Sequence, residues 1–162
     1  MTIQIGDHIP EVTLQRIREG VETLDTNALF DGRNIVLFAV PGAFTPTCSE
    51  KHLPGFVQNF DEFRSQGIEV ACMSVNDPFV MQAWGQSQHV PEGLMMLADG
   101  NGDFARALGL ELDASAYGMG RRARRFSLYA EDGVVKLLNV EAPGEFRVSS
   151  AEHMLAQLKQ DV

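Results

Sequence analysis

The stretch "RNIVLFAVPGAFTPTCSEKHLPGF", residues 33–56, decides the fold. It begins with a nearly continuous apolar run at 33–40, crosses an uncharged loop, and then enters a segment with helical spacing. Such a run is typical of a central strand that is covered on both faces. The stretch therefore predicts a strand, a loop and a helix, with the loop at the carboxyl end of the strand. Ligands and catalytic groups gather at this edge of an open α/β sheet.

Strands and helices alternate along the rest of the chain, which predicts one α/β domain over residues 1–162. Apolar runs predict further strands at 67–75 and 94–99. Two more runs lie on either side of "EDG" (131–133), and this spacing predicts a β-hairpin with a glycine turn.

The segments between the predicted strands have helical patterns. Helices are expected at 53–60, 77–88, 103–108 and 149–160. The second of them has Asp77 as its N-cap and Pro78 at its first position, and the last has Ser150 as its N-cap. Pro54 should kink the first helix or mark its first turn.

The composition of the 162 residues suits a domain with a sizeable core, since 44% of them are hydrophobic. A formal net charge of −9 argues against nonspecific binding of nucleic acid, which needs clustered cations. No apolar stretch is long enough for a transmembrane helix, and the opening "MTIQIGDHIP" lacks the pattern of a secretory signal. Two cysteines are too few for a disulfide scaffold, so a reducing compartment, the cytoplasm, is expected.

Cys48 ends the loop and lies in the first turn of the predicted helix. The helix can begin with Thr45 as its N-cap and Pro46 as its first residue. Alternatively, Thr47 is the cap and Glu50 closes a capping box. In either case Cys48 lies where backbone N–H groups have no intrahelical partner and where the helix dipole favours negative charge. A thiolate is the nucleophilic form of cysteine, so the position indicates a reactive Cys48, although a small buried hydrophobe also fits it.

Two other roles are open to Cys48. Cys48 and His52 have the i, i+4 spacing of half a zinc site, but the other histidines are isolated and supply no second pair. His52 could also be the base of a Cys–His hydrolase, although no oxyanion loop or third member of a triad is identifiable. Cys72 lies within the apolar "VACMSV" and is expected to be inert core.

The segment "PGAFTPTCSEKHLPGF" (41–56) closely resembles the active-site segment of peroxiredoxins, whose signature is Pro-x-x-x-Thr-x-x-Cys. Pro41, Thr45 and Cys48 match this signature, and "HLPGF" (52–56) is similar to the peroxiredoxin-5-type subfamily. The resemblance covers about residues 3–160 and continues in order at 70–84, 94–110 and 124–141. It implies a thioredoxin-like fold, with a central mixed β-sheet flanked by helices. It also implies that the protein reduces hydroperoxides without a metal or any other cofactor.

The resemblance also implies a role for each matched residue. Cys48 corresponds to the peroxidatic cysteine, whose thiolate attacks the distal peroxide oxygen and becomes a sulfenic acid. Thr45 corresponds to the threonine whose hydroxyl orients the peroxide and contacts the thiolate, and Pro41 to the proline that shields the site from water. Arg125 corresponds to the family arginine, whose forked donors can stabilise charge on the departing oxygen. The backbone N–H groups of Thr47 and Cys48 can bind a peroxide oxygen in the manner of an oxyanion hole.

Arg125 is the last residue of "RRARR" (121–125) and is expected to begin a strand. The other arginines of this motif, Arg121, Arg122 and Arg124, are expected to form a basic surface patch. A nucleic-acid patch is the alternative, and the net charge of −9 argues against it.

The chain has no cysteine after Cys72, although many peroxiredoxins of this subfamily have a resolving cysteine late in the chain. The corresponding stretch, "GEFRVSSAEHML" (144–155), contains serines instead. We therefore expect a one-cysteine bacterial form, in which an external thiol reduces the sulfenic acid. Glutathione with glutaredoxin is the favoured reductant, and thioredoxin is the alternative.

The resemblance further implies a homodimer formed through the face around the active site. Phe44 and Trp84 are the interface candidates because aromatic residues are enriched at such contacts, and ordinary core packing is the alternative for both. The predicted function is a thiol peroxidase for hydrogen peroxide and alkyl hydroperoxides, without a nucleic-acid or membrane partner. A peroxide sensor that uses oxidation of Cys48 as a signal is the alternative, and it would not turn over.

Overall fold

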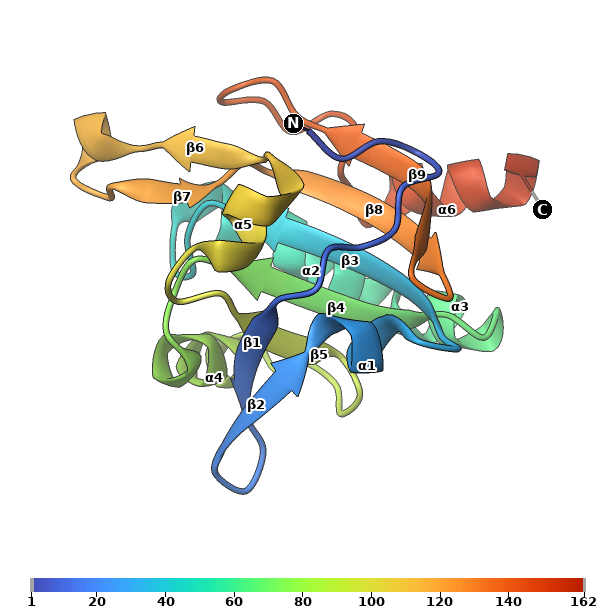
Figure 1. The fold of residues 1–162 in the computed structure, drawn as a ribbon, viewed down its shortest axis with the longest axis horizontal. Coiled ribbons are helices and arrows are strands. Elements are labelled where there is room, and N and C mark those ends of the chain that lie inside the picture. Colours follow the sequence, from blue (N-terminus) through green and yellow to red (C-terminus); the bar gives the residue numbers. More distant parts are fainter. Residues whose placement is uncertain (1, 162) are drawn as a thin grey trace.

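A mixed seven-stranded sheet forms the centre of the computed structural model, which describes residues 2–161 (Figure 1). Its strand order is β2-β1-β5-β4-β3-β8-β9, and a separate two-stranded sheet pairs β6 with β7. The neighbours β3, β4 and β5 are parallel, and all other pairs are antiparallel. The strands are β1 (Thr13–Ile17), β2 (Val21–Asp25), β3 (Asn34–Val40), β4 (Glu69–Ser74), β5 (Met95–Ala98), β6 (Glu111–Asp113), β7 (Arg121–Ala123), β8 (Phe126–Glu131) and β9 (Val134–Val140).

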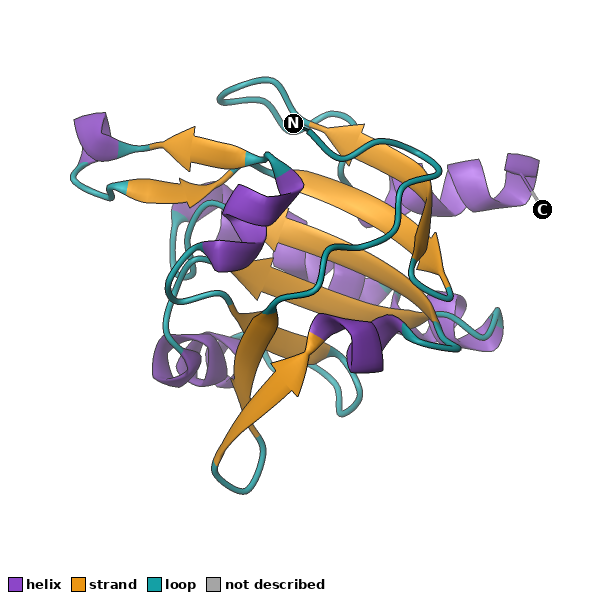
Figure 2. Ribbon diagram, viewed as in Figure 1, coloured by secondary structure: helices purple, strands orange, loops and turns teal. Residues whose placement is uncertain are grey.

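Helices cover both faces of the large sheet (Figure 2). One face carries α1 and α5, and the other carries α2, α3 and α6 (Figure 1). The helical elements are α1 (Thr26–Phe30), η1 (Cys48–His52), α2 (Leu53–Gln58), α3 (Phe60–Ser65), α4 (Pro78–Ser87), α5 (Asp103–Leu108), η2 (Ser115–Tyr117) and α6 (Ala151–Asp161). None of the helices described is long and apolar enough to cross a bilayer.

The central strand β3 is buried on both faces, as its apolar run predicts. Ile35, Leu37 and Ala39 belong to the core beneath α1 and α5. Val36, Phe38 and Val40 belong to the core beneath the helices of the other face. Cys48 and Cys72 both lie in this second core.

The predicted helix caps are present. The Asp77 carboxylate accepts a hydrogen bond from the Val80 N–H at 2.9 Å, and the Ser150 hydroxyl accepts one from the His153 N–H at 3.1 Å. The predicted strands at 67–75 and 94–99 and the predicted β8–β9 hairpin are confirmed. Arg125 lies directly before β8, so the expected strand begins one residue later than predicted.

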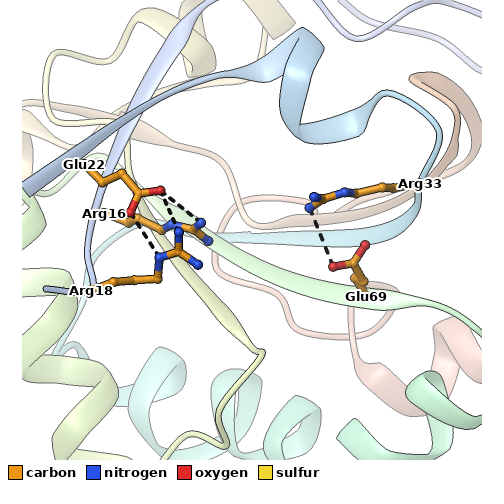
Figure 3. A network of polar contacts seen from close by, with 5 residues as sticks. All are labelled: Arg16, Arg18, Glu22, Arg33 and Glu69. Carbon is orange, nitrogen blue, oxygen red and sulfur yellow. Dashed lines mark hydrogen bonds and ion pairs between the residues drawn. The ribbon is translucent and has the colours of Figure 1, made fainter.

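Two groups of charged side chains form ion pairs at the surface (Figure 3). One group pairs β1 with β2 within their hairpin, and the other joins the amino ends of β3 and β4. Glu22 accepts from Arg16 at 3.2 Å and from Arg18 at 3.0 Å, while Arg33 and Glu69 lie 3.8 Å apart. Ion pairs between exposed side chains such as these contribute little to stability, because water screens the two charges. A groove of about 960 Å³ lies on this side of the molecule and includes several of these residues in its lining. It is distinct from the Cys48 region, which follows the carboxyl end of β3.

Candidate active site

Cys48 lies at the carboxyl end of β3, where the loop becomes a helix, and its side chain is fully buried. Helical geometry begins at Pro46, and the Ser49 N–H donates to the Thr45 carbonyl at 2.9 Å. Thr47 already has helical backbone angles, and its side chain makes no capping hydrogen bond. The helix therefore starts as the first alternative predicts, and the capping-box alternative is wrong.

The helix around Cys48 is wider than an α-helix. η1 is a π-helix, in which the Leu53 N–H donates to the Cys48 carbonyl five residues earlier. Pro54 has no N–H, and its ring would clash with the carbonyl of Glu50 in a regular α-helix. The wider turn relieves this conflict, and Pro54 lies in the first turn of α2 as predicted. Single π-turns of this kind are frequent at functional sites.

Arg125 joins Cys48 to His52. Its Nη2 donates to Cys48 Sγ at 3.1 Å, and its Nη1 donates to His52 Nδ1 at 2.9 Å. These contacts span 77 and 73 residues of chain, and they form because β8, which follows Arg125, pairs with β3. The ring centroid of Phe146 lies 6.0 Å from the guanidinium carbon. The structure thus places a permanent positive charge beside the buried sulfur.

His52 holds Arg125 from the other side, a role that was not predicted from the sequence. Its Nε2 lies 2.9 Å from the carbonyl oxygen of Ser149, so Nε2 carries the proton and Nδ1 accepts from Arg125. Burial of the ring, and then the charge of Arg125, lower the pKa of His52 from 6.5 to about 3, so the ring is neutral at neutral pH. Both ring nitrogens are hydrogen-bonded to groups other than Cys48, namely the Ser149 carbonyl and the Arg125 guanidinium. The interpretations of His52 as a hydrolase base or a zinc ligand are therefore wrong. No group of three or more His, Cys, Asp or Glu side chains within residues 2–160 is arranged to hold a metal ion.

The loop before Cys48 is anchored to the end of β4. Asn76 Oδ1 accepts from the Ala43 N–H at 3.0 Å and from the Ser74 hydroxyl at 2.5 Å. Asn76 was not identified from the sequence, although it follows a predicted strand as a polar residue. The Thr45 hydroxyl donates to the Gly42 carbonyl at 2.6 Å. Thr45 therefore directs its proton into the loop and has only lone pairs left to offer a substrate.

Comparison with known proteins identifies the family. The chain matches the Redoxin family over residues 4–155. It is 50% identical to Peroxiredoxin-2E, chloroplastic, of Arabidopsis thaliana, over 97% of this chain and 70% of that relative. The chain belongs to the peroxiredoxins. The thiol peroxidase activity and its dependence on a peroxidatic cysteine, both expected from the sequence, follow from this membership.

Solved structures of peroxiredoxins have the same thioredoxin-like fold, as predicted. Reduced Prx3 of Vibrio vulnificus in complex with H₂O₂ superposes with a TM-score of 0.93 at 48% identity, covering 97% of this chain and 99% of that one. Peroxiredoxin 5 of Alvinella pompejana superposes with a TM-score of 0.87 at 34% identity, covering 98% and 99% of the two chains.

The second cysteine of this peroxiredoxin is core, as expected. Cys72 is fully buried in β4. Burial raises the pKa of the Cys72 thiol well above its usual value, so this thiol stays protonated. Cys72 thus lacks the nucleophilic form that chemistry on sulfur requires.

The two interface candidates of the peroxiredoxin differ. Phe44 is 55% exposed, and its backbone has a φ of 65°. Trp84 is fully buried, and its Nε1 donates to the Ser49 hydroxyl at 3.0 Å. The expectation that Trp84 lies at an interface is therefore wrong, because its ring packs in the same core as Cys48. Pro41 is half-buried directly after β3.

The arginines before Arg125 do not form one free basic patch. Arg122 Nε donates to the Met119 carbonyl at 2.8 Å, and Arg124 Nη2 donates to the Glu141 carbonyl at 3.0 Å. Both guanidinium groups thus fix local backbone, and the expectation of a surface patch is wrong for them. Arg121 is exposed.

Proposed function

We propose that Cys48 is the peroxidatic cysteine of this peroxiredoxin and that Arg125 activates it. The observation that carries the proposal is the 3.1 Å hydrogen bond from Arg125 Nη2 to the buried Cys48 Sγ. A guanidinium cannot lose its proton at ordinary pH, so it stabilises a thiolate beside it. The thiolate attacks the distal oxygen of a hydroperoxide, and the S–O bond forms while the O–O bond breaks. Cys48 becomes a sulfenic acid, and the departing hydroxide or alkoxide takes up a proton.

The rest of the loop would hold the peroxide. Because the hydroxyl of Thr45 donates to Gly42, its lone pairs are suited to accept the O–H of a hydroperoxide. The backbone N–H groups of Thr47 and Cys48 lie in the first helical turn, where no intrahelical carbonyl competes for them. They are suited to bind the oxygen on which charge develops. Pro41 shields this side of the site from water.

We propose that an external thiol regenerates Cys48. Cys72 is the other cysteine of the chain, and it is buried in the core with its thiol protonated. The stretch 144–155 has no cysteine. The lack of a further cysteine supports a one-cysteine form. We propose further that the protein is of the peroxiredoxin-5 type and works as one domain of residues 1–162 in a reducing compartment such as the cytoplasm. Glutathione, delivered with glutaredoxin, is the proposed reductant.

The Cys72→Ser variant tests this proposal. It is expected to keep the wild-type rate of hydroperoxide reduction with glutathione and glutaredoxin within about 2-fold, because the buried thiol takes no part in resolution. The measurement is steady-state consumption of peroxide over many equivalents.

Three other outcomes of that measurement would contradict the proposal. A folded Cys72→Ser variant that stops after one equivalent would show that Cys72 resolves the sulfenic acid. Turnover with thioredoxin but not with glutathione would make thioredoxin the reductant. A wild-type protein that stops after one equivalent with every reductant would be a sensor.

We also propose that the protein forms a homodimer that covers Phe44. Phe44 and Phe79, 55% and 65% exposed, lie in the two segments that the Ala43–Asn76 hydrogen bond joins. Phe44→Glu is expected to convert a dimer at micromolar concentration into a monomer, because a charge would be buried at the contact. Sedimentation velocity measures this, with Val21→Glu on the exposed part of β2 as the control. A monomeric wild-type protein would exclude the dimer.

A further inference from the structure

A buried carboxylate directly after β9 has no part in the chemistry described so far. Glu141 is 3% exposed. Its Oε2 accepts from the N–H groups of Arg147 and Val148 at 2.8 Å each, and from the N–H and hydroxyl of Ser149 at 2.7 Å each. Its Oε1 accepts a further bond from the Arg147 N–H at 2.9 Å. Burial alone would raise the pKa of Glu141, but these hydrogen bonds together lower it, so the carboxylate is ionised at neutral pH.

The donors to Glu141 come from one short segment, residues 147–149. This segment lies between β9 and α6 and belongs to neither a strand nor a helix. Its N–H groups therefore have no partners in regular secondary structure, and the carboxylate supplies them. A buried N–H that loses its partner costs about 1–3 kcal/mol, so the ionised side chain of Glu141 determines the path of this segment.

The same segment contacts the peroxide site. The Ser149 carbonyl accepts the Nε2–H of His52 at 2.9 Å, and His52 Nδ1 accepts from Arg125 Nη1 at 2.9 Å. Arg125 Nη2 then donates to Cys48 Sγ at 3.1 Å. Phe146, which precedes the segment, has its ring centroid 5.0 Å from that of His52. A continuous series of hydrogen bonds thus runs from Glu141 to Cys48.

Glu141 is also tied to Arg125 through the main chain. The Glu141 N–H donates to the Arg125 carbonyl at 2.9 Å. This bond extends the β8–β9 pairing by one step and fixes the backbone of Arg125. The side chain of Arg125 is oriented by its hydrogen bond to His52, which Ser149 holds in turn. The backbone and the side chain of Arg125 thus both depend on the position of Glu141.

We propose that Glu141 is a positioning residue of the peroxide site, which holds Arg125 against Cys48 through Ser149 and His52; this rests on the proposed roles of Cys48 and Arg125. The tautomer of His52 explains how the effect reaches Arg125. Nδ1 can accept from Arg125 only while Nε2 keeps the proton, and the Ser149 carbonyl favours that tautomer. If the segment moves, Nδ1 can carry the proton instead, and an N–H would then face the guanidinium. Arg125 would lose its support and swing away from the sulfur.

The test compares Glu141→Gln with Asp99→Asn. Asp99 is also 3% exposed and accepts backbone N–H bonds, from Phe104 and Ala105, but it makes no hydrogen bond to the series that ends at Cys48. Glu141→Gln removes the charge and one acceptor oxygen while preserving the shape of the side chain. The rate of Cys48 oxidation by hydrogen peroxide is expected to fall about 10-fold or more, by analogy with residues that hydrogen-bond to metal ligands, whose mutation typically costs about 10- to 100-fold. Asp99→Asn is expected to lower the unfolding temperature and leave this rate unchanged.

Two readouts distinguish positioning from a general loss of stability. The oxidation rate is followed in a single turnover by the fluorescence of Trp84, the one tryptophan, which bonds to Ser49 beside Cys48. The fraction of Cys48 ionised at neutral pH is followed by thiolate absorbance, and it is expected to fall in Glu141→Gln only. If Glu141→Gln does not fold, Ser149→Ala removes one donor to the carboxylate and leaves the carbonyl that His52 uses. It should then show a smaller fall in the same direction.

The possible results are separable. A folded Glu141→Gln protein with the wild-type rate and thiolate fraction would overturn the proposal. An equal loss of rate in Asp99→Asn would overturn it too, since any loss of stability would then suffice. In a His52→Phe background, Glu141→Gln should cause no further fall, and a full additional loss would show that Glu141 does not act through His52. If Cys48 of the wild-type protein reacts with hydrogen peroxide no faster than free cysteine does, the proposed function itself fails. The wild-type measurement alone shows this, so it is distinguishable from a failure of the Glu141 proposal.

Discussion

Cys48→Ser is expected to lower the rate of hydroperoxide reduction by at least about 10³-fold, to the background of peroxide and reductant alone. A serine hydroxyl stays protonated at neutral pH even beside a guanidinium, so no anion is available to attack the peroxide. The substitution replaces sulfur by oxygen in a fully buried side chain, and the change in volume is small. The fold should therefore persist, which circular dichroism and the unfolding temperature would check.

The matched control for Cys48→Ser is Cys72→Ser, in the same core and equally buried. It removes a thiol of the same kind without touching Arg125. If Cys48→Ser kept more than a few per cent of the peroxide turnover while folded, Cys48 would not be the nucleophile. If both variants failed to reduce even the first equivalent of peroxide, the loss would instead indicate damage to their shared core.

The centre of the fold was predictable because burial leaves a simple pattern there. In β3 every residue after the first is buried, so the strand is a continuous apolar run. The β1–β2 hairpin was not predicted, since one residue of β1, Leu14, is buried and β2 has none. Its charges instead pair across the hairpin, and such pairing leaves no periodic apolar signal. β6 and β7 have three residues each, too few for a pattern to emerge.

The reactive residue was predictable, but its supports were not. The local motif places Cys48 at a helix start, whereas the roles of His52 and Glu141 depend on hydrogen bonds to Ser149, 97 residues from one and 8 from the other. Helical spacing alone also does not tell which side of α4 faces the core. The structure buries Trp84 and exposes Phe79, the reverse of what an interface at Trp84 requires.

Arg125→Met is expected to lower the second-order rate of Cys48 oxidation by about 10²–10³-fold, the usual cost of removing a donor to a developing charge. Methionine keeps much of the length and apolar stem of the side chain but removes the charge and both hydrogen bonds, to Cys48 Sγ and His52 Nδ1. Arg121→Met, at an exposed position of β7, is the control for loss of one positive charge and should leave the rate unchanged.

Arg125→Lys separates the charge from the geometry of the guanidinium. The lysine ammonium keeps the positive charge, but it is a single point and cannot span two acceptors in the fixed fork that bridges Cys48 and His52. If charge alone activates the sulfur, Arg125→Lys should retain most of the wild-type rate. We expect a loss of about 10-fold or more, because the orientation of the donor toward the departing oxygen also matters. Single-turnover fluorescence of Trp84 would measure all three variants. A folded Arg125→Met protein with the wild-type rate would leave the backbone N–H groups of Thr47 and Cys48 as the sole stabilisers of that charge, and the role assigned to Arg125 would be wrong.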